Sequence, residues 1–174
     1  MDKIITGYVD KGSYFTINRA RQFGKTTTLY LLERQLQEHY TVIRLSFEAA
    51  DELFQSLYTF TKGLIRSISR ELKMQKADAG LIQQWEQPVF QDLPFSDLSD
   101  RITQLCSDNE KKIVLMIDVV DKSANNQIFL SFLGLLRNKY LEQQQRISPA
   151  KECMDYIWIS KCNPYIFAGQ KRTF

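Results

Sequence analysis

The chain has few of the residues that build disulfide frameworks, zinc sites or histidine-based active sites. Its 174 residues include three cysteines and one histidine. Cys106, Cys153 and Cys162 are an odd number without Cys-x-x-Cys spacing, so they predict reduced thiols rather than a disulfide framework or a zinc site. His39 falls at the end of a predicted helix, where the helix dipole favours a cation, and this position suits a helix terminus better than a catalytic base.

Long hydrophobic runs and a charge of one sign are also missing. No apolar stretch approaches the length of a membrane span, and residues 1–7 (MDKIITG) do not form the apolar segment of a secretion signal. The 23 basic and 20 acidic residues are spread along the chain and leave a net charge of +3, so charge indicates neither nucleic acid nor an anionic membrane as a partner. The 44% hydrophobic composition predicts a single globular domain over residues 1–174. The missing span and signal, together with reduced thiols, predict that this domain is soluble and cytoplasmic.

Residues 16–27 (TINRARQFGKTT) are a near-match to a phosphate-binding loop. In the full signature, G-x-x-x-x-G-K-[ST], main-chain N–H groups surround the phosphates, the lysine reaches the β- and γ-phosphates, and the hydroxyl binds Mg²⁺. Gly24, Lys25 and Thr26 match the end of the signature, whereas Arg19 stands where the first glycine belongs. The segment predicts a strand, a tight loop and a helix N-terminus, which favours an anion. Because such a tripeptide also occurs by chance, a surface turn with an incidental lysine stays open on this motif alone.

A second segment, residues 113–118 (IVLMID), is an apolar run that ends in a carboxylate. An apolar run of this length suits a strand that is buried on both faces of a parallel sheet. Nucleotide sites open at the carboxyl ends of such strands, and an aspartate there, Asp118, can hold Mg²⁺. The alternative is a core strand that ends in a turn-forming aspartate. The two segments together favour nucleotide binding over that alternative.

Residues 14–26 (YFTINRARQFGKT) and 113–123 (IVLMIDVVDKS) resemble the AAA-ATPase-like family of prokaryotic P-loop proteins. In that family the loop often reads Arg-Pro-Arg-Arg-Phe-Gly-Lys-Ser, so an arginine at position 19 fits the pattern. The resemblance runs from about Asp10 to about Leu141. It implies an α/β fold: a three-layer, P-loop NTPase-like parallel sheet with helices on both faces, in which another strand lies between the loop strand and the Mg²⁺-carboxylate strand.

The resemblance also implies a site for ATP and Mg²⁺, built from a Walker A loop and a Walker B strand. Thr26 and Asp118 would bind the metal. The loop residues that would bind the nucleotide are Arg21, Phe23, Gly24, Lys25, Thr26 and Thr27.

The chain departs from the family pattern immediately after Asp118. The family usually has a glutamate there, which activates the attacking water, whereas this chain has Val119. A valine cannot accept a proton, and loss of a positioned general base costs on the order of 10² to 10⁴ in rate. Asp121 is a candidate replacement without a spacing rule to support it. The catalytic residue therefore stays unknown: the motifs predict nucleotide binding, and the valine predicts weak or absent hydrolysis.

The rest of the chain predicts strands and helices around these motifs. Residues 41–47 and 156–160 have the composition of strands. A long helix is expected to be opened by Asp51 and Glu52, and Ser96 is expected to cap another. The apolar residues at helical spacing that predict the helices are Leu29, Leu32 and Leu36; Leu53, Leu57, Leu64, Ile68 and Leu72; Leu98, Ile102 and Leu105; and Ile128, Phe129, Phe132, Leu133, Leu136 and Tyr140.

Two segments are expected to lie outside this regular pattern. Residues 77–95 are polar, contain glycine and proline, and predict an insertion loop. From about Cys162 the sequence no longer resembles the family, so residues 162–174 are interpreted as a divergent tail of a truncated or frame-shifted chain. The sheet is then expected to lack its last strand, which leaves the loop strand as an exposed edge.

Three functions stay open. The first is an ATP-binding P-loop domain with weak ATPase activity, and the second is a nucleotide-gated interaction module that does not hydrolyse ATP. The third is a nucleic-acid-associated protein, for which the basic residues Lys171 and Arg172 and the family resemblance are the evidence. A homo-oligomer or a protein partner is compatible with each, and no membrane partner is expected.

Overall fold

The computed structural model describes residues 2–10, 15–16, 25–47, 51–90, 94–119, 126–145 and 154–160. The chain begins with a short helix that continues as a π-helix, labelled α1 and η1, and a 3-10 helix, η2, precedes α3. In chain order the elements are α1 (Asp2–Ile4), η1 (Ile5–Val9), β1 (Phe15–Thr16), α2 (Lys25–Leu36), β2 (Thr41–Ser46), η2 (Asp51–Gln55), α3 (Leu57–Met74), α4 (Ala79–Trp85), α5 (Phe95–Asp108), β3 (Ile113–Val119), α6 (Gln127–Gln145) and β4 (Met154–Ser160).

The strands form one parallel sheet in the order β1-β4-β3-β2. β3 lies inside the sheet, as its apolar sequence predicts, and pairs with β2 on one side and β4 on the other. β4 lies between β1 and β3, in agreement with the additional strand that the family resemblance implies. Among the described residues, β1 and β2 are the two edges of the sheet.

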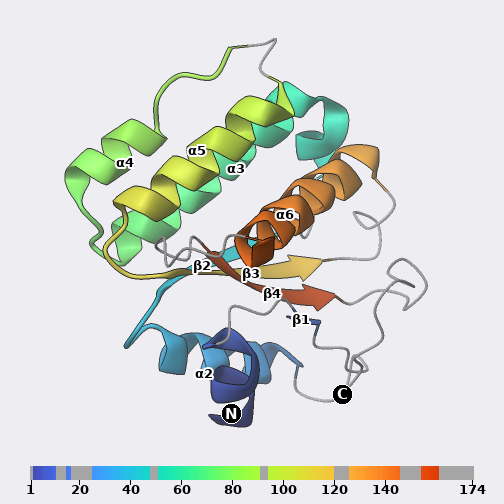
Figure 1. The fold of residues 1–174 in the computed structure, drawn as a ribbon. Coiled ribbons are helices and arrows are strands. Elements are labelled where there is room, and N and C mark those ends of the chain that lie inside the picture. The colour runs from blue at the N-terminus through green and yellow to red at the C-terminus, as the bar shows by residue number, and fades with distance from the viewer. Residues whose placement is uncertain are drawn as a thin grey trace.

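Helices cover both faces of the sheet, and the two faces bury alternate residues of the same strands. On one face Ile43 and Leu115 pack with α3, α4, α5 and α6; on the other, Val42 and Val114 pack with α2 and the N-terminal helix. Figure 1 shows these two groups of helices on opposite sides of the strands. Because successive side chains of a strand point to opposite faces, a strand with apolar residues at every position needs cover on both sides. The structure is therefore α/β with a parallel sheet, as predicted, and helices pack on both faces of that sheet.

Two helices begin at other residues than the sequence predicts. α3 begins at Leu57, because the Ser56 hydroxyl accepts from the Thr59 amide at 3.1 Å and the Thr59 hydroxyl accepts from the Ser56 amide at 3.1 Å. This reciprocal capping box starts a new helix and leaves Asp51 and Glu52 in the preceding 3-10 helix. α5 begins at Phe95, after the extended residue Pro94. The prediction that Ser96 caps α5 is wrong, since Ser96 lies inside the helix.

The segment that was expected to be a loop, residues 77–95, contains the helix α4. The Asp78 carboxylate caps it by accepting from the Leu81 amide at 2.9 Å. Leu81 and Trp85, one turn apart, are 6% and 3% exposed, and the Trp85 indole N–H donates to the Ile65 carbonyl at 3.1 Å. The loop prediction is wrong for residues 79–85, because two large apolar side chains bind this polar segment to the core.

The described residues contain no helix that is both long enough and apolar enough to cross a membrane. The Cys106 side chain is buried, 4% exposed. The other two cysteines, Cys153 and Cys162, lie outside the described residues.

Candidate functional site

The helix that follows the predicted phosphate loop is α2, and it begins at Lys25. Lys25 and Thr26 therefore start a helix of 12 residues. Leu29, Leu32 and Leu36, the leucines predicted from spacing, are at most 1% exposed and fix α2 against the sheet. A helix start has main-chain N–H groups without partners inside the helix, which together with the helix dipole favour an anion.

Most of the predicted loop falls outside the part of the chain that the structure describes. Arg19, Arg21, Phe23 and Gly24 are not among the described residues, and of Lys25 and Thr26 only the main chain is described. Thr27 is exposed in the first turn of α2. The structure thus gives the two ends that the loop connects: β1 ends at Thr16, and α2 begins at Lys25.

Asp118 lies at the carboxyl end of β3, as the apolar run predicts. It is half-buried and stands in register with Ser46 of β2 and Ile159 of β4. Its main-chain carbonyl accepts from the Phe47 amide at 3.3 Å. The carboxylate is therefore carried by an inner strand that is held on both sides, which fixes its position at that end of the sheet.

The topology brings the start of α2 and Asp118 to the same end of the sheet. β1 pairs with β4 through Thr16 and Trp158, and Trp158 pairs with Ile117, the residue before Asp118. The chain thus leaves β1 at the level where β3 ends. α2 must then run back along the smaller face, because β2 begins at Thr41, at the opposite ends of the strands. In Figure 1 the arrowheads of β3 and β4 point to the same side, above α2.

The residue in the expected glutamate position, Val119, is the last residue of β3. It is in register with Ser160, the last residue of β4. Asp121, the candidate replacement base, lies outside the described residues. The register also brings Ser46 to the level of Asp118. The sequence reasoning missed Ser46 and Ser160 as neighbours of the site, although each is a hydroxyl residue near the end of a predicted strand.

The donor groups at this end of the sheet fit one metal better than others. In the described segments no group of three or more histidine, cysteine, aspartate or glutamate side chains is placed to hold a metal ion. Mg²⁺ in phosphate sites does not need such a group, since it is held by one or two carboxylates together with waters and substrate phosphates. One carboxylate, Asp118, and a hydroxyl at the start of α2 are chemically suited to Mg²⁺ that arrives with a nucleotide.

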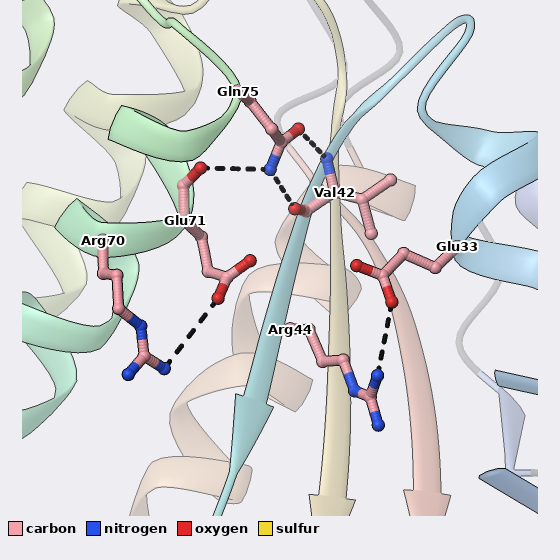
Figure 2. Close-up of polar contacts among 6 residues, drawn as sticks. All are labelled: Glu33, Val42, Arg44, Arg70, Glu71 and Gln75. Atoms are coloured by element: carbon pink, nitrogen blue, oxygen red, sulfur yellow. Dashed lines mark hydrogen bonds and ion pairs between the residues drawn. The ribbon is translucent and has the colours of Figure 1, made fainter. Parts of the chain in front are cut away.

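A separate groove of about 720 Å³ lies at the opposite, amino ends of β2 and β3. Glu33, Glu71 and Gln75 line it, together with Thr41 and Asn109. Burial raises the pKa of Glu71, and the nearby Glu33 acts in the same direction, whereas Arg70 and Arg44 oppose the shift. Figure 2 shows these side chains around β2. Of the predicted ligands whose side chains the structure describes, Thr27 and Asp118, neither lines this groove.

A family model described as an AAA-like domain matches residues 2–171. The match includes both sequence motifs and continues past Leu141 and Cys162, so the sequence-based estimate of where the resemblance ends was too short. No curated protein and no solved structure matches the chain significantly.

Proposed function

Because the chain belongs to the AAA-like domain family, we propose that it is a nucleotide-binding, ATPase-like module that binds Mg²⁺-ATP where β1 and β3 end. The family supports nucleotide binding in general. The finer proposal is a three-layer P-loop domain in which residues 19–26 form the Walker A loop and β3 carries the Walker B carboxylate. This finer proposal rests on the two sequence motifs and on the positions of the elements that flank them, β1, α2 and β3.

One observation carries the proposal: α2, which begins at Lys25 within the Gly-Lys-Thr sequence, and Asp118 of the inner strand β3 lie at the same end of one parallel sheet. The two segments are about 90 residues apart in the sequence, and the family match alone does not bring them together. Ligands of open α/β sheets bind outside the carboxyl ends of the strands. Lys25 and Asp118 would thus both lie at the end of the sheet where this kind of fold favours a nucleotide.

Each residue has a role that follows from its chemistry. The main-chain N–H groups of the loop and of the first turn of α2 would bind phosphate oxygens, and the Lys25 ammonium would neutralise them. Thr26 and Asp118 would hold Mg²⁺, and Arg21, Phe23 and Thr27 would complete the nucleotide contacts. When bound, Mg²⁺ neutralises the charge that develops on the phosphates.

Val119 favours binding without rapid hydrolysis. With a valine next to Asp118, no carboxylate stands in the family's usual position to orient and activate a water. The second candidate function follows from this residue: a nucleotide-gated interaction module that binds ATP and a protein partner but turns ATP over slowly or not at all.

A nucleotide titration monitored by thermal unfolding tests the proposal. Saturating Mg²⁺-ATP, at about 100 times Kd, should stabilise the wild-type chain by roughly 2.7 kcal/mol. Lys25→Ala should remove this stabilisation and leave the nucleotide-free protein folded. Arg34→Ala is the matched control, because it removes an exposed positive charge from the other end of the same helix. A wild-type chain that no nucleoside triphosphate stabilises would refute the phosphate-loop assignment.

A second variant tests the metal ligand. Asp118→Asn keeps the volume of the side chain but loses the charge that balances Mg²⁺, so its nucleotide affinity in Mg²⁺ should fall towards the affinity measured in EDTA. If the variant and the wild type depend on Mg²⁺ equally, Asp118 is not the metal carboxylate.

A further inference from the structure

The edge strand β2 has one side that no strand of the described residues covers. In the ladder with β3, the Thr41 amide donates to the Lys112 carbonyl and the Phe47 amide to the Asp118 carbonyl. Since main-chain groups of a strand alternate in direction, the odd-numbered residues of β2 face β3 and the even-numbered ones, Val42, Arg44 and Ser46, face outward. An edge of this kind is a template for pairing with another chain.

The Gln75 side chain occupies this edge at Val42. Its carboxamide oxygen accepts from the Val42 amide at 3.0 Å, and its carboxamide nitrogen donates to the Val42 carbonyl. Figure 2 shows the carboxamide lying against the main chain of β2. A side chain thus makes the same pair of hydrogen bonds that one residue of a neighbouring strand would make.

Val42 needs this partner, and Gln75 is held in place to provide it. Val42 is fully buried, and buried main-chain polar groups that lack a partner are costly. Gln75 directly follows α3, where its amide donates to the Glu71 carbonyl at 3.1 Å and its carboxamide nitrogen reaches the same carbonyl at 3.3 Å. The next residue, Lys76, turns away with a φ of 55°. The end of α3 therefore fixes the carboxamide at the edge of the sheet.

A charged pair stands at the next outward position. Arg44 donates to the Glu33 carboxylate at 3.4 Å, from β2 to α2. Charged side chains on an edge strand oppose pairing with another strand. Of the consecutive outward-facing residues of β2, Val42 thus has its main chain bound by Gln75, and Arg44 carries a charged side chain.

We propose that Gln75 is an edge plug that keeps β2 of this chain from pairing with β2 of a second copy. A second copy is the relevant partner, because it always presents the same strand, and two antiparallel β2 edges related by a two-fold axis are self-complementary. The sequence of β2, TVIRLS, is rich in β-branched residues and suits such a pairing. Assembly of the AAA-like module with further copies would then use a surface other than this edge.

Substitution of Gln75 tests the plug. Gln75→Met keeps the length of the side chain and removes both hydrogen bonds, so hydrogen exchange of the Val42 amide should accelerate by about tenfold. The Ile43 amide, which faces β3, should change little. Light scattering should show association at concentrations where the wild type is monomeric. Gln37→Ala is the matched control, since it alters another glutamine in the same groove.

The variant Gln75→Glu separates the contributions of the two hydrogen bonds. Its carboxylate can accept from the Val42 amide but cannot donate to the Val42 carbonyl, so the amide should stay protected while association lies between the wild type and Gln75→Met. Unchanged exchange at Val42 in a folded Gln75→Met protein would overturn the hydrogen-bonding role. A monomeric Gln75→Met protein with an exposed Val42 amide would overturn the plug. Both results are independent of ATP, so they separate this proposal from the nucleotide site.

Discussion

The two faces of the sheet differ in how much core they carry. The larger face buries side chains from α3, α4, α5 and α6 and includes five stacked or edge-on phenylalanines, with ring centroids 5.2 to 6.1 Å apart. These are Phe47, Phe54, Phe60, Phe129 and Phe132. The smaller face buries Val9 and three leucines of α2 against Val42, Val114 and Met116.

The larger face therefore contributes mainly to stability, whereas the smaller face carries the proposed nucleotide site. Among the described residues, the larger face supplies most of the buried apolar side chains and therefore most of the hydrophobic stabilisation. The smaller face carries the helix whose first residues are the proposed phosphate ligands. A ligand bound at the start of α2 can therefore stabilise the less extensively packed side of the sheet, while the larger face provides a fixed base.

The largest effect is expected from a cavity in the larger face. Phe60 is fully buried among the phenylalanines, and Phe60→Ala should lower the free energy of unfolding by about 3–5 kcal/mol.

Leu32→Ala, in the smaller face, should lower the free energy of unfolding by about 2–5 kcal/mol. This variant should also weaken nucleotide binding, because Leu32 fixes α2 to the sheet. Urea unfolding and nucleotide titration measure the two effects. If both variants weaken nucleotide binding equally, the faces are not functionally distinct.

The strands and most helices could be predicted from local pattern. An apolar run with polar residues on either side predicts β3. Apolar residues at helical spacing predict α2 and α6. These patterns suffice because the side chains that each element buries recur in its sequence at the spacing of a helix or a strand.

The errors come from interactions between residues that are distant in the sequence or from local hydrogen bonds that compete. α4 lies in a segment that is otherwise polar and contains glycine and prolines, and the Asp78 cap together with the packing of Leu81 and Trp85 on the core makes it a helix. The true start of α3 depends on the Ser56 and Thr59 side chains, which outweigh the acidic residues upstream. Of the candidate site, the sequence predicted the positions of Lys25 and Asp118, but not the register that places Ser46 and Ser160 beside Asp118 and Val119. The register depends on how two strands pair, so the sequence of one strand alone does not determine it.

A gain-of-function change at the end of β3 should affect turnover without affecting the larger face. Val119→Glu supplies the missing carboxylate next to Asp118 and should raise single-turnover ATP hydrolysis by on the order of 10². The unfolding free energy without nucleotide should change far less than in Phe60→Ala. Val119→Gln is the control, since it has a similar shape but cannot act as a base. An unchanged rate in a protein that binds ATP would mean that the missing base does not limit hydrolysis.

The smallest effect concerns a carboxylate at the rim of the larger face. Glu71, on α3, has a side chain only 14% exposed, and burial, together with Glu33, raises its pKa, whereas Arg70 and Arg44 oppose the shift. A raised pKa in the folded state means that Glu71 contributes stability when protonated, below its ordinary value of about 4.5, and that this contribution is lost as the pH rises through the folded pKa. Glu71→Gln removes the buried charge, so it should unfold at higher urea than the wild type at neutral pH, and the advantage should shrink below pH 4.5. Glu86→Gln is the control with the opposite sign, because a hydrogen bond from Lys73 lowers the pKa of this exposed carboxylate. An advantage of Glu71→Gln that is the same at pH 4 and pH 7 would show that its carboxylate charge is not what burial penalises.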